Sequence, residues 1–402
     1  MRSETLICFI VLKWCIVLFV IFLAVFYSTN EVNINGKQKT IHVSPARVIS
    51  SSTDNGISIE AEKTLQFVFG MMRHGTRASY RKPYKRDPYS NFTKYFPAGV
   101  AQLTMSGKNQ SYNIGKLLKQ RYSEFLTDSS DVFFQSTPKM RNILTMQIVG
   151  YTLFSNDSLS ELLDKKDLSK IKIHSENYNF DKTAVQFNQT YCPRFVKLWE
   201  NGWEKLNSTE EMQEMYTLLS DYTGEEIKTA VDVFQMWDYL SAQDHIGLTL
   251  PSETKYFYPK KLRSMASKLH KGMCADNSDM LNITAGPMIH FIYDLFLQPT
   301  YKAFFHCSHD TTIYPVLLAL GLPDVHIVNP GSMLLLELHQ LYKEPVLKIF
   351  YLDQLSEEKQ LTEFFLPGCK SQCPLKDFLQ ILQNLHFVNS KNWNMLCQNT
   401  TL

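Results

Sequence analysis

The stretch Leu65–Arg77 constrains the fold of this 402-residue chain more than any other. Its first part, Leu65–Met72, is an apolar run with the length and the Phe and Val content of a buried β-strand. The run ends in Arg-His-Gly-Thr-Arg, and the glycine allows a sharp backbone turn. In an open α/β sheet, ligands bind just beyond the carboxyl ends of strands. We therefore expect an α/β fold with a ligand site at the end of this strand.

Two further strand-type runs end in polar groups of the same kind. Asp131–Gln135 is followed by Arg141, one turn into the next predicted helix. Tyr301–His306 is followed by His309 and Asp310. Because ligand-binding groups gather at the carboxyl edge of such a sheet, we expect these side chains to lie beside those of the first strand.

The assembled edge would hold three arginines, two histidines and one carboxylate. Planar guanidinium groups suit phosphate oxygens, a histidine can contact phosphate or attack it, and a carboxylic acid can protonate a leaving oxygen. The chain shows no Gly-rich phosphate loop and no obvious acidic cluster for magnesium. The sequence therefore predicts phosphoryl transfer without a metal or cofactor, through a covalent intermediate on histidine.

The remaining segments complete an α/β domain with a helical insertion. Predicted helices are Gln110–Phe125, Asn142–Phe154, Arg194–Leu206, Thr209–Ser220, Ile227–Leu240, Pro259–Lys271, Thr311–Leu320 and Lys376–Asn384. Two late predicted strands, Ser332–His339 and Pro345–Leu352, are joined by a turn and indicate a mixed sheet. We expect a three-layer αβα domain with a central mixed sheet, and a smaller mostly α-helical domain inserted after the second core strand.

The expected division of the chain follows from these segments. It assigns 1–28 to a signal anchor or signal peptide, 29–63 to a polar stem, 64–155 to the first part of the α/β core, 156–299 to the helical lobe, and 300–402 to the second part of the core and a C-terminal disulfide region. With 44% hydrophobic residues the chain can build one large domain or two interlocked ones. A net charge of +2 gives no broad basic face, so we expect no nucleic-acid partner.

The N-terminal segment is a targeting signal. Leu6–Tyr27 is almost wholly apolar, interrupted only by Lys13, and is long enough to span a bilayer. It is either a cleaved signal peptide or an uncleaved anchor, and the missing small-x-small site around Ala24–Ser28 favours the anchor. No second apolar run of that length is evident. We expect entry into the secretory lumen, as a type II membrane protein or a secreted one, lysosomal or at the cell surface.

Sequons and cysteines fit an oxidising, luminal compartment. Asn-x-Ser/Thr triplets predict glycosylation at Asn91, Asn109, Asn156, Asn188, Asn207, Asn282 and Asn399. Six cysteines after the stem are disulfide candidates: Cys192, Cys274, Cys307, Cys369, Cys373 and Cys397. The short spacing of Cys369 and Cys373 fits a tight disulfide better than a zinc site, because no histidine pair follows at finger spacing.

The chain also resembles a known family at several places. Met72–Ala78 resembles the Arg-His-Gly signature of the histidine phosphatases, branch two, which includes histidine acid phosphatases and phytases. Ser308–Thr312 resembles the distal His-Asp motif of that branch, and Ser136–Arg141 resembles its middle element. Leu103–Tyr122 matches a stretch of the animal acid phosphatases, and Pro367–Leu375 resembles the late disulfide loop of the lysosomal and prostatic types.

The resemblance implies a role for each site residue. His74 would be the nucleophile, and Asp310 would protonate the leaving alcohol of a phosphomonoester. The phosphate would be held by Arg73, Arg77, Arg141 and His309. An attacking histidine must be neutral, and three nearby arginines disfavour its protonation, so we predict that His74 stays unprotonated well below neutral pH.

The resemblance also implies the disulfides. The expected pairs are Cys192–Cys397 and Cys369–Cys373, which leave Cys274 and Cys307 unpaired. A third family disulfide is missing, with its two positions near Ala242 and Met333.

The middle motif departs from the family pattern in two places. Pro138 stands where a carboxylate is usual, and Asn142 stands where a threonine is usual. These departures make the aim of Arg141 the least determined feature of the predicted site.

The predicted function is an acid phosphomonoesterase, and two alternatives remain open. One is a phytase-like inositol phosphate phosphatase, for which Lys82, Lys85, Arg86 and Lys94 would form a basic rim, although such a run is usually a solvated face. The other is an inactive membrane-anchored glycoprotein ectodomain, which the stem and sequons alone would permit. The animal acid phosphatases are commonly dimers, so the resemblance also implies a homodimer.

Overall fold

The structure is a computed structural model of the chain. It describes residues 63–165, 167–176, 192–322, 327–341, 343–354, 361–369, 372–385 and 390–399. The predicted anchor, most of the predicted stem and the sequon at Asn188 lie outside the described residues.

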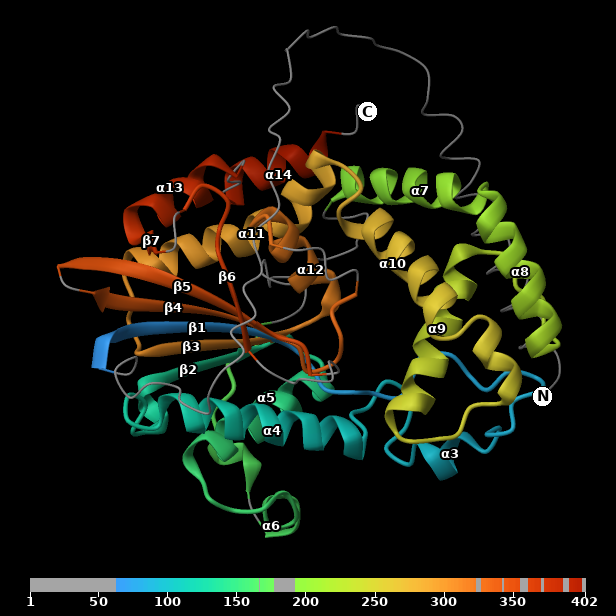
Figure 1. Ribbon diagram of the computed structural model, residues 1–402, viewed down its shortest axis with the longest axis horizontal. Helices are drawn as coiled ribbons and strands as arrows, with labels where there is room; N and C mark the ends of the chain where they lie inside the picture. The colour runs from blue at the N-terminus through green and yellow to red at the C-terminus, as the bar shows by residue number, and fades with distance from the viewer. Residues whose placement is uncertain are drawn as a thin grey trace, which may run out of the picture. The chain divides into compact units, whose positions relative to one another are not determined.

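The described residues form a seven-stranded mixed sheet (Figure 1). Its strands are β1 (Leu65–Arg73), β2 (Val132–Ser136), β3 (Ala303–Ser308), β4 (Met333–Leu341), β5 (Glu344–Leu352), β6 (Leu361–Phe364) and β7 (Cys373–Pro374). The order is β2-β3-β1-β4-β5-β6, with β7 paired to β5. β1, β2 and β3 run parallel, whereas β4, β5 and β6 extend the sheet in antiparallel pairs. The mixed sheet confirms the predicted fold class, and β6 and β7 are additions that the sequence did not reveal.

Helices cover both faces of the sheet, because the side chains of each strand alternate between them. On β1, Phe67, Phe69 and Met71 pack towards one layer of helices, and Val68 and Met72 pack towards the other. The first layer contains α11 (Ser278–Leu297), α12 (Asp310–Ala319) and α13 (Leu375–Asn384), and the second contains α4 (Met105–Tyr122) and α5 (Met140–Phe154). Figure 1 shows these two layers on either side of the strands.

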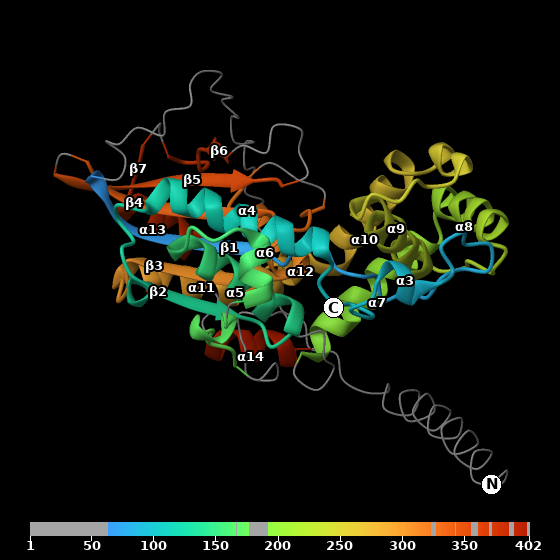
Figure 2. The same ribbon diagram turned by 90° about the horizontal axis from the view of Figure 1, so that it is seen from below.

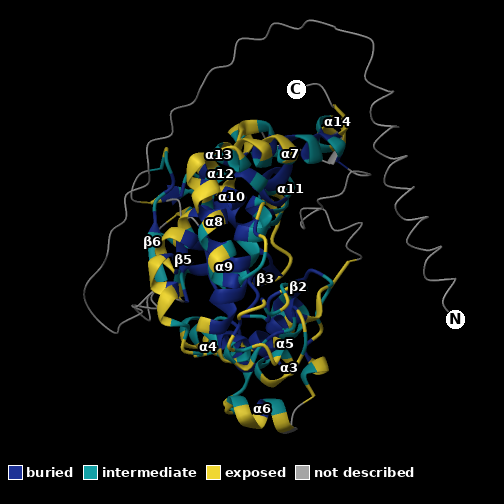
Figure 3. Cartoon of the chain, turned by 90° about the vertical axis from the view of Figure 1, so that its right-hand side faces the viewer, coloured by how far each residue is buried: buried dark blue, intermediate teal, exposed yellow. Residues whose placement is uncertain are grey.

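A second group of helices lies beyond the carboxyl ends of the parallel strands (Figures 1 and 2). It comprises α7 (Pro193–Asn207), α8 (Glu210–Thr223), α9 (Ala230–His245) and α10 (Lys260–Cys274). α8, α9 and α10 share a hydrophobic cluster of their own, which includes Met212, Met236 and Leu262. Figure 3 shows that these helices carry both buried and exposed residues. The division of the chain at 156 and 299 stays a prediction.

The short helices lie outside this group. α3 (Phe92–Tyr95) falls in the loop after β1, and α6 (Leu159–Lys165) packs Leu162 against Leu103 and Ile148 of the α4–α5 region. α14 (Ser390–Gln398) packs against α7 and α11.

One expectation about apolar runs is corrected by α11. This 20-residue helix is long and apolar enough to cross a bilayer by length and composition, although the sequence suggested no second such run. Half of its most apolar window is buried in the protein, and Ile289, Ile292 and Phe296 belong to the core beside the sheet. Its composition is therefore explained by packing in a three-layer fold.

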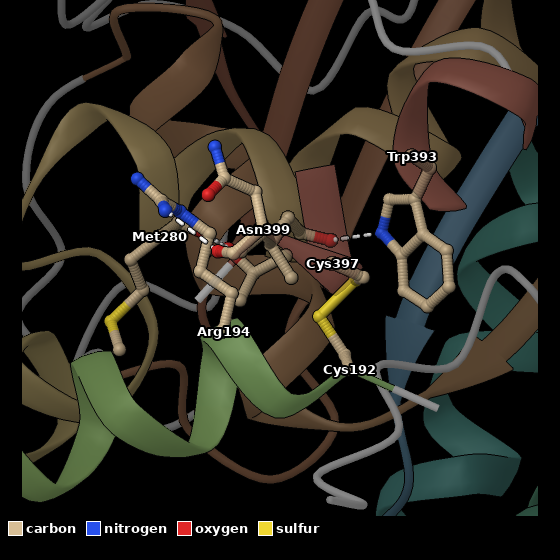
Figure 4. Close-up of a disulfide and its surroundings, with 8 residues drawn as sticks. Cys192, Arg194, Met280, Trp393, Cys397 and Asn399 are labelled. Carbon is tan, nitrogen blue, oxygen red and sulfur yellow. Dashed lines mark hydrogen bonds between the residues drawn. A yellow bond between two sulfur atoms is a disulfide. The ribbon is translucent and has the colours of Figure 1, made fainter. Parts of the chain in front are cut away.

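The structure contains both expected disulfides, Cys192–Cys397 and Cys369–Cys373. Figure 4 shows how the first joins the start of α7 to α14. Around it, the Arg194 guanidinium donates to the carbonyl oxygen of Asn399 at 2.8 Å, and the indole of Trp393 donates to the carbonyl oxygen of Ile283 at 2.9 Å. The disulfide therefore ties the C-terminal helix to the start of α7, and the Trp393 hydrogen bond ties it to α11.

Two cysteines, Cys274 and Cys307, are free and fully buried, as the family resemblance implied. Burial raises the pKa of the Cys307 thiol, and burial likewise raises that of Cys274. Both thiols are therefore protonated and inert under ordinary conditions, and they pack as small apolar side chains.

The described sequons differ in accessibility. Asn91, Asn109, Asn156 and Asn399 are exposed. Asn207 and Asn282 are half-buried, and the side-chain oxygen of Asn207 accepts hydrogen bonds from the Tyr216 hydroxyl and the Ala230 amide at 2.7 and 2.9 Å. The four exposed positions are the ones open to a glycan.

Candidate active site

The parallel strands bring the predicted site residues to one edge of the sheet. Arg73 at the end of β1 pairs in register with Ser308 at the end of β3, and Ser136 at the end of β2 pairs with Cys307. The backbone amide of His74 also lies 3.4 Å from the carbonyl oxygen of Ser308. The side chains that follow these three strands therefore meet at the same carboxyl edge.

The turn after β1 is packed directly against the first turn of α4. A Cβ at Gly75 would lie 2.3 Å from the carbonyl oxygen of Gly107, and a Cβ at Gly107 would lie 2.1 Å from the carbonyl oxygen of Thr76. The amide of Thr76 also donates to Oε1 of Gln110 at 2.7 Å. Only glycine fits where two backbones approach this closely, so both glycines hold the His74 turn in place.

His74 is buried, with 2% of its surface exposed, and its ring is oriented by its own turn. Its Nδ1 lies 2.8 Å from the carbonyl oxygen of Gly75. A carbonyl oxygen can only accept, so Nδ1 carries the proton and the lone pair is on Nε2. Burial, followed by the charges of Arg141 and Arg73, holds the pKa of His74 well below its usual value. The direction agrees with the prediction of a neutral histidine, and burial is a larger cause than the arginines.

Two of the site arginines are fixed by carboxylates. Nη2 of Arg73 lies 2.8 Å from Oδ2 of Asp310, and its Nη1 donates to the carbonyl oxygen of Val328 at 2.6 Å. The two terminal nitrogens of Arg77 each lie 3.0 Å from an oxygen of Asp238. Bidentate pairing of this kind sets the plane of a guanidinium group as well as its position.

Arg141 enters the site from the first turn of α5 and is 9% exposed. The neighbouring Asn142 is fully buried, and its Nδ2 donates to the carbonyl oxygen of Ser308 at 2.9 Å. This bond ties the start of α5 to the end of β3. The residue that departs from the family pattern thus anchors the turn that carries Arg141.

His309 and Asp310 form the junction between β3 and α12. The His309 ring centroid lies 5.6 Å from that of His74, and its Nε2 is 3.1 Å from the hydroxyl of Thr137. Burial, followed by the charge of Arg141, lowers the pKa of His309 to about 3. Burial raises the pKa of the Asp310 carboxyl, but Arg73 and the nearby histidines outweigh it and hold that pKa well below its usual value.

A pocket adjoins these groups and extends towards the helical insertion. It is lined by Arg73, Thr76, Arg77, Trp237, Asp238, Ser241, Ala242, His245, Ile327, Asn329 and Pro330. Burial lowers the pKa of His245 to about 4, so this imidazole is neutral around neutral pH. Among the described residues, no group of three or more His, Cys, Asp or Glu side chains is arranged to hold a metal ion.

The structure places all six predicted side chains around this edge and adds neighbours that sequence reasoning missed. Asp238 comes from α9, 161 residues after the arginine it pairs with, and no local motif marks it. Tyr80 stacks beside Arg77, with 4.7 Å between the guanidinium carbon and the ring centroid. It lies in the loop that follows β1, and no motif singled it out in the sequence.

Known proteins are similar to this chain in sequence and in fold. The model of the histidine phosphatase superfamily (branch 2) matches residues 64–244. A venom acid phosphatase from Apis mellifera is 26% identical over 367 residues, which cover 85% of this chain and 89% of the relative. Lysosomal acid phosphatase from Homo sapiens is 25% identical over 354 residues, which cover 84% of this chain and 81% of the relative.

The structure of a phytase from Citrobacter braakii superimposes on this chain with a TM-score of 0.58 and 14% sequence identity. The alignment covers 80% of this chain and 98% of the phytase chain. At that identity the likeness concerns the fold alone. Matching motifs, relatives aligned over most of their length and a shared architecture agree: residues 64–244 match the histidine phosphatase superfamily, branch 2, and the relatives of this chain in sequence are acid phosphatases.

Proposed function

We propose that this protein is a metal-independent acid phosphomonoesterase that acts through a covalent phosphohistidine intermediate. The observation that carries the proposal is the neutral, oriented His74 amid arginines. Its Nδ1 proton faces the carbonyl oxygen of Gly75, and its pKa is depressed by burial and by the surrounding charges. A neutral imidazole beside several fixed cations is suited to attack a phosphoryl group.

Binding of the phosphomonoester is assigned to Arg73, Arg77, Arg141 and His309. The three guanidinium groups would contact the non-bridging oxygens and neutralise charge that spreads over them in the transition state. His309 would donate one further hydrogen bond as a neutral imidazole.

In the first chemical step the lone pair on Nε2 of His74 forms a bond to phosphorus, and the bond from phosphorus to the leaving oxygen breaks. Asp310 supplies the proton that this oxygen takes up. In the second step Asp310 removes a proton from water, the resulting hydroxide attacks phosphorus, and the N–P bond breaks to release phosphate and restore His74.

The charge state of Asp310 explains why acid favours the reaction. In the unliganded protein Arg73 holds this carboxyl in its ionised form, so it has no proton to give. A phosphomonoester monoanion carries its own proton, because the second pKa of a phosphomonoester is about 6. The bound phosphate competes for Arg73, and transfer of its proton to Asp310 prepares the acid for the first step. The reactive substrate form is therefore the monoanion.

The adjoining pocket fits a single phosphate better than a polyphosphorylated ring. Both lining arginines are already paired with carboxylates, and the apolar side chains of Trp237, Ile327 and Pro330 form much of the wall. The lysines and the arginine of the suggested basic rim are exposed and do not line the pocket. These contacts support a phosphomonoesterase over an inositol polyphosphate phosphatase.

The test uses the full chain produced in a eukaryotic secretory pathway and assayed in detergent. p-Nitrophenyl phosphate is supplied at acid pH with EDTA present. The proposal predicts turnover that EDTA leaves intact and that His74→Ala abolishes. Activity that EDTA removes, or that survives His74→Ala, contradicts it, and a folded wild-type protein with no turnover supports the inactive ectodomain instead.

The cellular setting is proposed on the same basis. Relatives include lysosomal, prostatic and venom acid phosphatases, which are consistent with a secretory-pathway location. We propose that the N-terminal apolar segment anchors this protein as a type II membrane protein, with glycans at the exposed sequons. Homodimer formation is a further proposal, which the sedimentation of the detergent-solubilised protein would test.

A further inference from the structure

The three phosphate-site arginines differ in what holds them. Arg73 pairs with Asp310, and Arg77 pairs with Asp238. Within the described part of the chain, no carboxylate lies within ion-pair distance of Arg141. A guanidinium group that is 9% exposed still needs partners, because a buried donor without one is costly.

The partner of Arg141 is an aromatic ring. The guanidinium carbon of Arg141 lies 5.7 Å from the ring centroid of Tyr80, and that of Arg77 lies 4.7 Å from the same centroid. Burial lowers the pKa of the Arg141 guanidinium group, and its interaction with Tyr80 acts in the opposite direction, in favour of the charged form. The tyrosine is nevertheless 55% exposed, which is unusual for a large side chain with two such contacts.

A neutral partner has a specific electrostatic consequence. A carboxylate would offset much of the charge of the arginine, whereas a phenol fixes the guanidinium group and leaves its charge in place. This charge is felt at the site, since Arg141 is the leading electrostatic cause of the lowered pKa of His74 and of His309. Arg141 is therefore the least compensated cation available to an incoming phosphoryl group.

We propose that Tyr80 is a positioning residue of the phosphate site: its ring holds Arg141 beside Arg77 without cancelling the charge that binds the phosphoryl group. The inference rests on the proposed phosphatase function and deepens it, because it names the residue that aims the third arginine. Tyr80 contacts neither the nucleophile nor the acid, so it acts through Arg141.

The experiment compares Tyr80→Phe, Tyr80→Leu and Tyr80→Glu in the full chain. Inhibition of p-nitrophenyl phosphate hydrolysis by inorganic phosphate and by orthovanadate gives Ki, and initial rates give KM and kcat. Tyr256→Leu is the matched control, because Tyr256 is 63% exposed and also contacts a cation, Lys255, at 5.1 Å from its ring centroid.

We expect Tyr80→Leu to raise the Ki for orthovanadate roughly tenfold, to raise KM similarly and to change kcat less, because a partly desolvated cation–π contact is lost. Tyr80→Phe keeps the ring and should recover most of that loss. Of the three variants, Tyr80→Glu should bind phosphate and orthovanadate most weakly, because its carboxylate cancels the charge of Arg141. In an Arg141→Ala background, Tyr80→Leu should change Ki no further.

A wild-type Ki in Tyr80→Leu, tighter phosphate binding in that variant, or Tyr80→Glu no weaker than Tyr80→Leu would overturn the inference. So would independent effects of Tyr80→Leu and Arg141→Ala. Failure of the phosphatase proposal gives a different result, namely no turnover in the wild type. Orthovanadate binding measured by calorimetry then still reports on Tyr80. Tyr80→Phe, the smallest change, keeps the test valid if a larger substitution unfolds the protein.

Discussion

Arg73 and Asp310 are joined by an ion pair of 2.8 Å between Nη2 and Oδ2, at the point where β1 and α12 meet. The arginine holds the pKa of the carboxyl low, so the group proposed as the general acid is ionised before substrate binds. An enzyme built in this way depends on its substrate to deliver the proton.

The first prediction concerns the pH dependence of kcat/KM. Its alkaline limb should follow the second pKa of the substrate and not a group on the protein, falling about tenfold per pH unit above roughly pH 6 for an ordinary phosphomonoester. Profiles for two aryl phosphates that differ in this pKa check the claim. The limb should move with the substrate, and a limb fixed at one pH for both would show that a protein group controls it.

A second prediction concerns Asp310→Asn, which keeps the shape of the side chain and removes its acid. Loss of general acid catalysis should lower kcat by about 10²–10⁴-fold for an alkyl phosphate, whose leaving oxygen needs a proton. The loss should be much smaller for p-nitrophenyl phosphate, whose leaving group is stable as an anion. Steady-state rates with the two substrates measure the difference, and equal losses would argue against proton donation by Asp310.

The third prediction tests the bidentate pair of Arg77 with Asp238. Asp238 also accepts from the hydroxyl of Ser79 at 2.6 Å, so it holds both the arginine and the loop that follows. Asp238→Asn should raise KM about tenfold with a smaller change in kcat, because losing a charge-assisted bond costs about 1.5–3 kcal/mol, part of which falls on binding. Asp221→Asn on the exposed side of α8 is the control. An unchanged KM in Asp238→Asn would show that the ion pair does not aim Arg77.

A fourth prediction concerns stability at acid pH. In the folded protein the pKa of His309 is about 3, below its ordinary value of 6.5. Between these two pH values the imidazole therefore binds a proton in the unfolded chain but not in the folded protein. Its contribution to stability is full above pH 6.5 and is lost as the pH falls towards 3, by about 1.4 kcal/mol per pH unit.

Denaturant unfolding of wild type and His309→Asn at several pH values between 7 and 4 measures this contribution. The variant should lose less stability on acidification than the wild type, with His290→Asn on α11 as the matched substitution outside the site. Parallel pH dependences for wild type and His309→Asn would mean that His309 does not remain neutral in the folded protein.

The sequence predicted the parts of the fold that depend on local patterns. Apolar runs of strand length identified β1, β2 and β3, and the polar groups that follow them were enough to place His74 and Asp310 at one edge. β6 was missed because its four residues show no clear alternation of apolar and polar side chains. In the structure only Phe364 of this strand is buried, and the other three residues are half-buried. α11 was missed because Pro287 and a polar start interrupt a pattern that tertiary packing nevertheless completes.

The site was less predictable where it depends on distant segments. No motif connects Asp238 with Arg77, and only the fold brings α9 to the end of β1. Asn142 was read as a departure from the family pattern, but its buried amide donates to Ser308 and steadies the turn that carries Arg141. Local sequence supplies the reacting groups, whereas their orientation depends on long-range contacts that no short pattern encodes.

The central claim is that His74 carries the phosphoryl group during turnover. Its most direct test is to mix the full chain with a ³²P-labelled phosphomonoester in the presence of EDTA, quench in alkaline detergent within the first turnovers, and map the label by mass spectrometry. The account predicts an acid-labile, alkali-stable phosphoramidate on His74 that forms before free phosphate and is absent from His74→Ala. Turnover without protein-bound label, or a label on another residue, would contradict it.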